Sequence, residues 1–146
     1  MYLLDTTHCL QFILGFPKIQ DKRSILDSSI VTTSVIARGE LLFGAHKSGR
    51  LMDSLIKIDT FFDDITVYPI DDNTADIYGE LKNIILDQFG PKDRNKRRNF
   101  KVESLGFKDN DLWITSTAIQ HNLVLVSEDN HVLRLQGVNG LKVESW

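Results

Sequence analysis

The stretch DNDLWITSTAIQHNLVLVSED, residues 109–129, contains a helix-to-strand unit with acidic residues at both ends. Its segment from about 111 to 121 is typical of a helix, and the apolar run at 123–127 is typical of a buried strand. In an α/β domain, ligands bind at the carboxyl ends of parallel strands, and Asp129 follows this strand. The stretch therefore predicts an α/β fold with a functional acid at one edge of its sheet.

The rest of the chain continues this alternation. Apolar runs predict further strands at 2–5, 30–32, 65–68 and 142–144. Helical patterns fill the intervals at 8–14, 18–28, 35–46, 51–62, 74–87 and 130–136. Strands that alternate with helices and carry apolar residues on both faces favour a parallel sheet covered by helices on each side.

The length and composition indicate one folded domain spanning residues 1–146. Hydrophobic residues at 42% and charged residues at 25% are ordinary for a globular protein and exclude a fibrous or disordered chain. The single cysteine, Cys9, cannot form an internal disulfide, which favours a reducing cytoplasm and a small buried side chain. The first sixteen residues carry no basic leader and are too interrupted to span a bilayer, so we expect neither export nor membrane insertion.

The charge is segregated, although the net charge is only −3. Six basic residues and one acid lie between Lys92 and Lys101, which leaves 11 basic and 19 acidic residues elsewhere. We expect segment 88–108 to be irregular, because it contains glycine and proline breakers. Its candidate RNA-binding residues are Arg94, Lys96, Arg97, Arg98 and Lys101. A solvated, mobile surface loop is the alternative.

Four acids occupy comparable places in the predicted fold. Asp5 ends the first strand, Asp111 begins a helix and Asp129 follows the fourth strand, while Glu40 lies on an apolar helix face and requires a partner. Parallel strands would bring Asp5, Asp111 and Asp129 to one edge of the sheet, and Glu40 could reach the same edge from its helix. Carboxylates held close repel one another, and one or two Mg²⁺ or Mn²⁺ ions are the simplest compensation. Such a site can orient water and stabilise charge on a phosphodiester.

Each acid alone has a structural alternative. Asp5, Asp111 and Asp129 could be helix caps or loop residues, and Glu40 could pair with a neighbouring base, either Arg38 or Lys47. A phosphatase that uses Asp5 as its nucleophile is a functional alternative. The haloacid-dehalogenase pattern requires a second Asp two residues later, where Thr7 stands. The histidines show no spacing typical of a zinc site.

Four segments together resemble one known family. They are YLLDTT at the start, TTSVIARGELLFGAHKSGR in the middle, NDLWITSTAIQHNLVLVSED late in the chain, and GLKVESW at the end. In order and spacing they resemble the PIN-domain nucleases, and within them the VapC-type ribonuclease toxins of type II toxin–antitoxin modules. The resemblance implies a three-layer α/β/α sandwich with a short, mostly parallel central sheet.

The resemblance also implies site residues and partners. By motif it assigns catalytic and metal-coordinating roles to Asp5, Glu40, Asp111 and Asp129, and supporting roles to Thr6 and Ser127. It implies cleavage of RNA dependent on Mg²⁺ or Mn²⁺, with transfer RNA as a family-level expectation, a homodimer, and silencing by a small antitoxin. A non-catalytic PIN-like module that binds RNA or a partner is the alternative. The presence of all four acids favours the enzyme.

Overall fold

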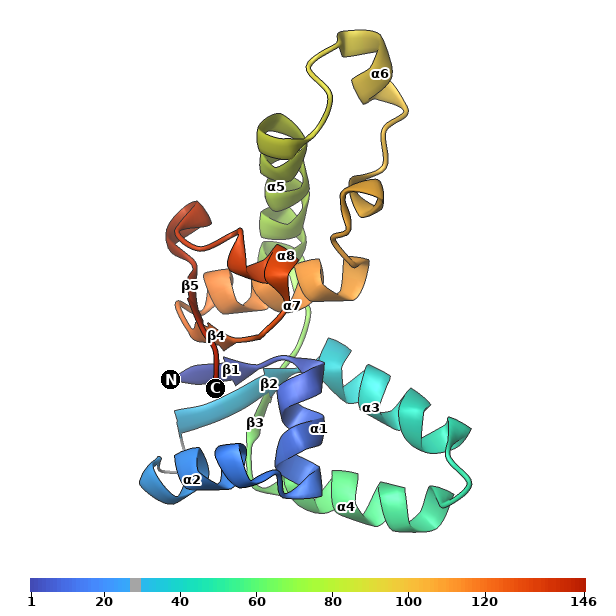
Figure 1. The fold of residues 1–146 in the computed structure, drawn as a ribbon, viewed down its shortest axis with the longest axis vertical. Helices are drawn as coiled ribbons and strands as arrows, with labels where there is room; N and C mark the ends of the chain where they lie inside the picture. The colour runs from blue at the N-terminus through green and yellow to red at the C-terminus, as the bar shows by residue number, and fades with distance from the viewer. Residues whose placement is uncertain (27–29) are drawn as a thin grey trace.

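A five-stranded parallel sheet forms the centre of the protein, as a computed structural model describing residues 1–26 and 30–146 shows (Figure 1). Its order is β3-β2-β1-β4-β5. The strands are β1 (Tyr2–Leu4), β2 (Val31–Ser34), β3 (Thr66–Tyr68), β4 (Val124–Val126) and β5 (Lys142–Glu144). All four neighbouring pairs are parallel, which confirms the fold class expected from the sequence.

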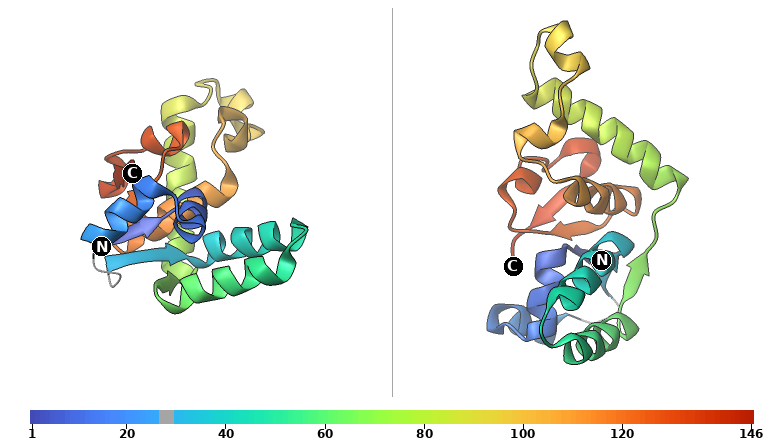
Figure 2. Two further views of the ribbon diagram at one scale, coloured as in Figure 1. Left: turned by 60° about the horizontal axis from the view of Figure 1, so that its bottom comes forward. Right: turned by 90° about the vertical axis from the view of Figure 1, so that its right-hand side faces the viewer.

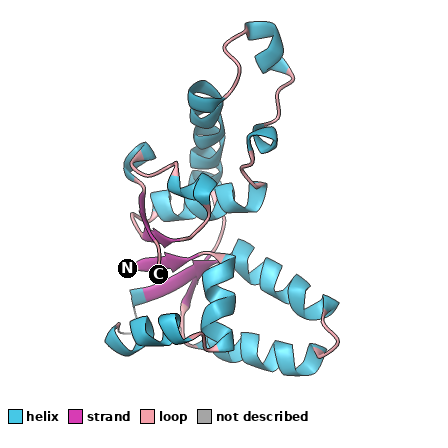
Figure 3. Cartoon of the chain, in the orientation of Figure 1, coloured by secondary structure: helices cyan, strands magenta, loops and turns pink. Residues whose placement is uncertain are grey.

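Helices cover both faces of this sheet (Figure 3). They are α1 (Thr6–Leu14), α2 (Pro17–Ile25), α3 (Val35–Lys47), α4 (Leu51–Asp63), α5 (Asp72–Phe89), α6 (Arg94–Arg98), α7 (Asp109–Gln120) and α8 (Asn130–Leu133). In Figure 1, α1, α2 and α4 lie below the sheet, whereas α5, α7 and α8 lie above it. The end of the helix predicted at 18–28 lies outside the described residues. No helix in the described ranges is long and apolar enough to cross a membrane.

The central strands are buried because helices pack on both of their faces. Leu3 and Leu4 of β1 are fully buried, as is Val126 of β4. Apolar residues at consecutive positions therefore face helices on either side, which explains the absence of alternation in these strands. Cys9 is also fully buried, as predicted, and burial raises the pKa of its thiol to about 12.

The order of the strands creates a crevice between β1 and β4. From β1 the chain runs outward through β2 to β3, then crosses back to β4 on the other side of β1. Right-handed crossovers place the two sets of helices on opposite faces, so the connections after β1 and β4 diverge. The amide of Asp5, directly after β1, donates to the Val126 carbonyl at 3.1 Å. Ligands bind at such a switch point in open α/β sheets.

Residues 88–108, here called the basic arm, are more regular than the sequence predicted. Helix α5 continues to Phe89, and α6 together with a 3₁₀ turn at Val102–Leu105 lies inside the arm. The expectation of an irregular segment was wrong at α6 because Asp93 caps that helix, accepting from the Lys96 amide at 2.9 Å. The arm projects beyond the rest of the molecule (Figures 1 and 2).

Side chains of α8 and of its C-cap residue hold the root of the arm. The Arg134 guanidinium lies 4.1 Å from the centre of the Phe89 ring and 5.5 Å from that of Phe107. Gly106 has φ +93°, and a Cβ atom there would lie 2.2 Å from Nε2 of His131. Only glycine fits this position without displacing the histidine. The arm is thus fixed at its base to the helix that follows Asp129.

Candidate metal centre

Three of the four predicted acids line one pocket at the carboxyl ends of β1 and β4. The pocket has a volume of about 240 Å³ and is lined by Asp5, Thr6, Thr7, Lys108, Asp111, Glu128 and Asp129. Asp5 follows β1, Asp129 follows β4, and Asp111 comes from the first turn of α7. The switch point of the sheet therefore brings together side chains that are far apart in the sequence.

Asp5 and Asp129 each cap the N-terminus of a helix through one carboxylate oxygen. Oδ1 of Asp5 accepts from the His8 amide at 2.8 Å, and Oδ1 of Asp129 accepts from the His131 amide at 2.8 Å. The capping role suggested as an alternative is thus real, but it uses one oxygen of each acid. The second oxygen of either acid accepts no hydrogen bond from residues 1–26 or 30–146. Both acids therefore retain an oxygen for a ligand.

The ionisation of Asp111 reflects its surroundings. The pKa of this carboxyl is raised to about 6, mainly by burial and also by the charges of Asp129, Glu40 and Asp5, while Lys108 opposes them. Its side chain is 22% exposed. Burial is the main reason why Asp111 is harder to ionise, and the contributions of Asp129, Glu40 and Asp5 show that these acids lie close enough to interact with it.

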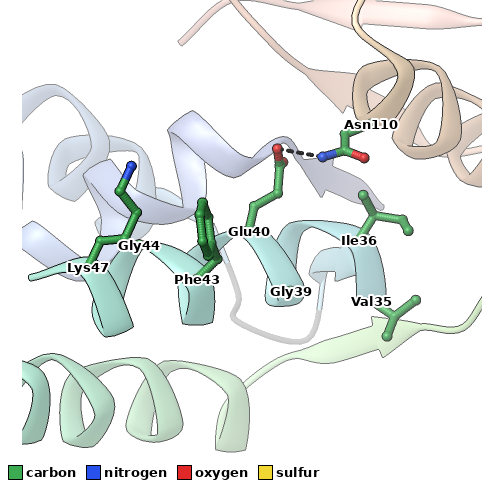
Figure 4. Close-up of a pocket in the computed structure, with 8 residues that line it drawn as sticks. All are labelled: Val35, Ile36, Gly39, Glu40, Phe43, Gly44, Lys47 and Asn110. Atoms are coloured by element: carbon green, nitrogen blue, oxygen red, sulfur yellow. Dashed lines mark hydrogen bonds between the residues drawn. The ribbon is translucent and has the colours of Figure 1, made fainter.

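Glu40 approaches the other three acids from α3. Its two oxygens accept hydrogen bonds from Thr6 Oγ1 and, at 2.8 Å, from Asn110 Nδ2 (Figure 4). The Glu40 carboxylate, which lies on an apolar helix face, therefore has polar but uncharged partners. Arg38 and Lys47, the alternative partners, lie over the rings of Phe62 and Phe43 instead, at 4.7 and 5.2 Å. Glu40 faces a groove along α3 rather than the acid pocket itself.

Lys108, Asn110 and His8 were not singled out from the sequence. Nζ of Lys108 lies 4.0 Å from an oxygen of Asp111 and 3.9 Å from one of Asp129. The Lys108 side chain is 74% exposed, so these ion pairs are weak. For Lys108 and Asn110, the one signal in the sequence was their position within three residues of Asp111.

The remaining predicted site residues lie at the edge of this arrangement. Ser127 is buried, and its hydroxyl accepts from the Asp129 amide at 3.2 Å, which holds the loop after β4. Glu128 pairs with Lys18 at 3.0 Å and is exposed. Asp109 bonds to Tyr78 and Lys82 of α5, away from the pocket. Glu128 and Asp109 are therefore engaged with lysines rather than directed at the other acids.

The donor set fits a hard divalent cation. Carboxylate oxygens are the ligands that Mg²⁺ and Mn²⁺ prefer, and the pocket is lined by four acids and one base, which leaves an excess of negative charge. In the part of the chain that the structure describes, no three His, Cys, Asp or Glu side chains already enclose one point at ligand distance. An ion would therefore have to draw the carboxylates closer together than they lie here, displacing Lys108.

The basic arm carries most of its predicted RNA-binding residues on its surface. Arg94, Lys96, Arg98 and Lys101 are exposed. Arg97 is half-buried and forms an ion pair with Asp87 of α5. The arm thus presents a cluster of positive charge that is separate from the acid pocket.

Known proteins resemble this chain over its whole length. The sequence profile of the PIN domain matches residues 2–138. Ribonuclease VapC2 of Rickettsia felis and ribonuclease VapC1 of Haemophilus influenzae are each 25% identical, over 100% of this chain and 98% of the relative. The crystal structure of VapBC2 from Rickettsia felis, bound to a DNA fragment from its promoter, superposes with a TM-score of 0.78 at 26% identity, covering 99% of this chain and 98% of that one.

We expect Asp111→Asn to flatten the pH dependence of stability in the metal-free protein. The pKa of Asp111 is about 6 in the folded chain against an ordinary value of 3.8, so folding favours the protonated form. The stability this contributes is present below pH 4 and is lost as the pH rises through 6, at a cost of about 2–3 kcal/mol. Urea unfolding with a chelator present, at pH 4 and pH 7, measures this. The same pH dependence in both proteins would contradict the placement of Asp111 among the other acids.

Proposed function

The chain belongs to the PIN-domain family, and we propose that it is a metal-dependent endoribonuclease that acts as the toxin of a type II toxin–antitoxin pair. The observation that carries this proposal is the convergence of Asp5, Asp111 and Asp129 in one pocket, with Glu40 beside them. Relatives that match the whole chain are named as ribonucleases, which supports the same activity.

Asp5, Glu40, Asp111 and Asp129 would hold the ion, Mg²⁺ or Mn²⁺. When bound, such an ion orients water and offsets negative charge on a phosphate. Four carboxylates would otherwise repel an RNA phosphate, so substrate binding depends on this compensation. The reaction is hydrolysis: a water oxygen bonds to phosphorus and the bond to the 3′ oxygen breaks, which leaves 5′-phosphate and 3′-hydroxyl ends.

The supporting residues hold these acids in place. Thr6 and Asn110 donate to separate oxygens of Glu40 and so fix its orientation. Ser127 holds the loop before Asp129. Lys108 places positive charge at the mouth of the pocket, where a phosphate would arrive. We assign these residues to positioning and to charge balance.

RNA binding is assigned to the basic arm. Its exposed basic side chains suit contacts with phosphates, and Phe100 could stack on a base. The tip of the arm around α6 projects away from the sheet (Figure 1), so it would hold parts of the RNA other than the cleaved bond. A transfer RNA is the substrate that the family resemblance suggests, and the cytoplasm is the corresponding compartment.

A small antitoxin is the proposed partner. Similar solved structures are VapBC complexes. A groove of about 470 Å³ runs between α1, α3 and α4 and is lined by Glu40 and Thr6 as well as by the exposed apolar side chains of Leu10 and Leu14. An apolar segment bound there would cover Glu40. A homodimer is proposed as well, and exposed apolar side chains on α3 and α4, such as Phe43 and Met52, offer surface for it.

The two alternatives receive less support. An Asp5 nucleophile is disfavoured because Thr7 stands where the haloacid-dehalogenase pattern requires a second Asp. A non-catalytic PIN-like module would need no cluster of carboxylates with a raised pKa at Asp111. A cleavage assay with and without divalent ions separates this module from the enzyme.

Asp5→Asn and Asp129→Asn should each reduce cleavage of RNA in Mg²⁺ by at least about 100-fold, because each removes one ligand charge. Asparagine is as good a helix cap as aspartate, so both variants should keep the fold and melt close to the wild type. Glu128→Gln lies in the same pocket and serves as a matched control that keeps most of the activity. Full activity in either Asn variant would refute the assignment of the site.

Replacing Arg94, Lys96 and Arg98 with Ser should weaken RNA binding without changing the fold. If each contacts one phosphate of single-stranded RNA, the slope of log affinity against log salt should fall by about 2. Affinity would be measured in the Asp129→Asn background to prevent cleavage. The triple variant of Arg50, Lys57 and Lys142, which removes three exposed charges elsewhere, is the control. Equal affinities would end the assignment of the arm to RNA.

A further inference from the structure

His8 is a buried histidine that touches a candidate metal ligand. Its side chain is fully buried and does not line the acid pocket. Its Nδ1 atom lies 2.8 Å from Oδ1 of Asp5, the oxygen that also accepts from the His8 amide at 2.8 Å. A carboxylate can only accept, so the ring proton must be on Nδ1. Both donors of His8 thus converge on one oxygen of Asp5.

Packing alone does not explain a histidine at this place. Nε2 of the ring is enclosed and has no hydrogen-bond partner among the described residues. A buried polar atom that makes no hydrogen bond destabilises the folded state. An apolar side chain of similar size, such as leucine, would avoid this cost. The ring is therefore better explained by its bond to Asp5 than by its contribution to the core.

We propose that His8 is a positioning residue for the metal site: it holds one oxygen of Asp5 so that the other faces the ion. The cap bond from the amide fixes a single point of the carboxylate, and the ring bond from a second direction restricts its rotation. Oδ2, which accepts no bond from the described residues, is then kept available for the ion. In known metalloproteins, residues that hydrogen-bond to a metal ligand orient that ligand toward the ion. The inference rests on the proposed metal site.

Titration calorimetry with Mn²⁺ on the full chain, without RNA, tests this role. His8→Leu should weaken Mn²⁺ affinity by about 10- to 100-fold. His8→Asn should stay near the wild type, since its amide nitrogen is as many bonds from Cα as Nδ1 and can donate to the same oxygen. Cys9→Ala changes the next buried residue, whose side chain does not bond to Asp5 and whose amide bond to the Asp5 carbonyl is kept, and it should bind Mn²⁺ normally.

Melting temperatures of the metal-free variants separate positioning from packing. His8→Leu should melt at or above the wild-type temperature, because it removes an unsatisfied polar atom. If His8→Leu does not fold, His8→Met takes its place as the apolar variant. Wild-type Mn²⁺ affinity in the folded apolar variant would overturn the inference, as would an equal loss in His8→Asn. Asp5→Asn is measured alongside. If both Asp5→Asn and the apolar His8 variant bind Mn²⁺ normally, the proposed metal site is wrong. If Asp5→Asn binds weakly while the apolar His8 variant binds normally, only the role of His8 is refuted.

Discussion

Mutual repulsion among carboxylates at the switch point of the sheet is the constraint on which this structure depends. Parallel β1 and β4 end side by side, so the acids that follow them are held together by the backbone. The pKa of Asp111 is raised mainly by burial, and the charges of Asp129, Glu40 and Asp5 add to the shift. The fold tolerates the charge because helices begin at the same place, and their positive ends face the acids. A bound cation would complete the compensation.

The same residues serve the fold and the proposed chemistry. Asp5 and Asp129 each cap a helix with one oxygen and keep the other for a ligand. Polar neighbours then fix individual acids: Asn110 holds Glu40, and His8 holds Asp5. Lys108 supplies an exposed positive charge at the mouth of the pocket. The site is thus built from helix starts, and changing a cap changes both stability and chemistry.

Periodicity and position were enough to predict most of the fold. The apolar runs around Leu3 and Leu125 identified the buried strands, and the acids that follow them pointed to one edge of the sheet. The residues that hold the acids could not be found in this way. His8 faces Asp5 only because Asp5 caps α1 and His8 lies in the first turn of that helix, and Asn110 meets Glu40 across 70 positions of sequence. Inside the basic arm, glycine and proline residues predicted an irregular segment, but Asp93 caps the short helix α6 and allows it to form.

The most direct test of the central claim is anomalous diffraction from crystals of this protein soaked in Mn²⁺. If the acids form a metal site, a peak should lie at roughly 2.0–2.6 Å from carboxylate oxygens of Asp5 and Asp129, in the pocket that Asp111 also lines. The Lys108 ammonium should have moved away from it. No peak in this pocket at saturating Mn²⁺, or a peak only at another group of acids, would contradict the account.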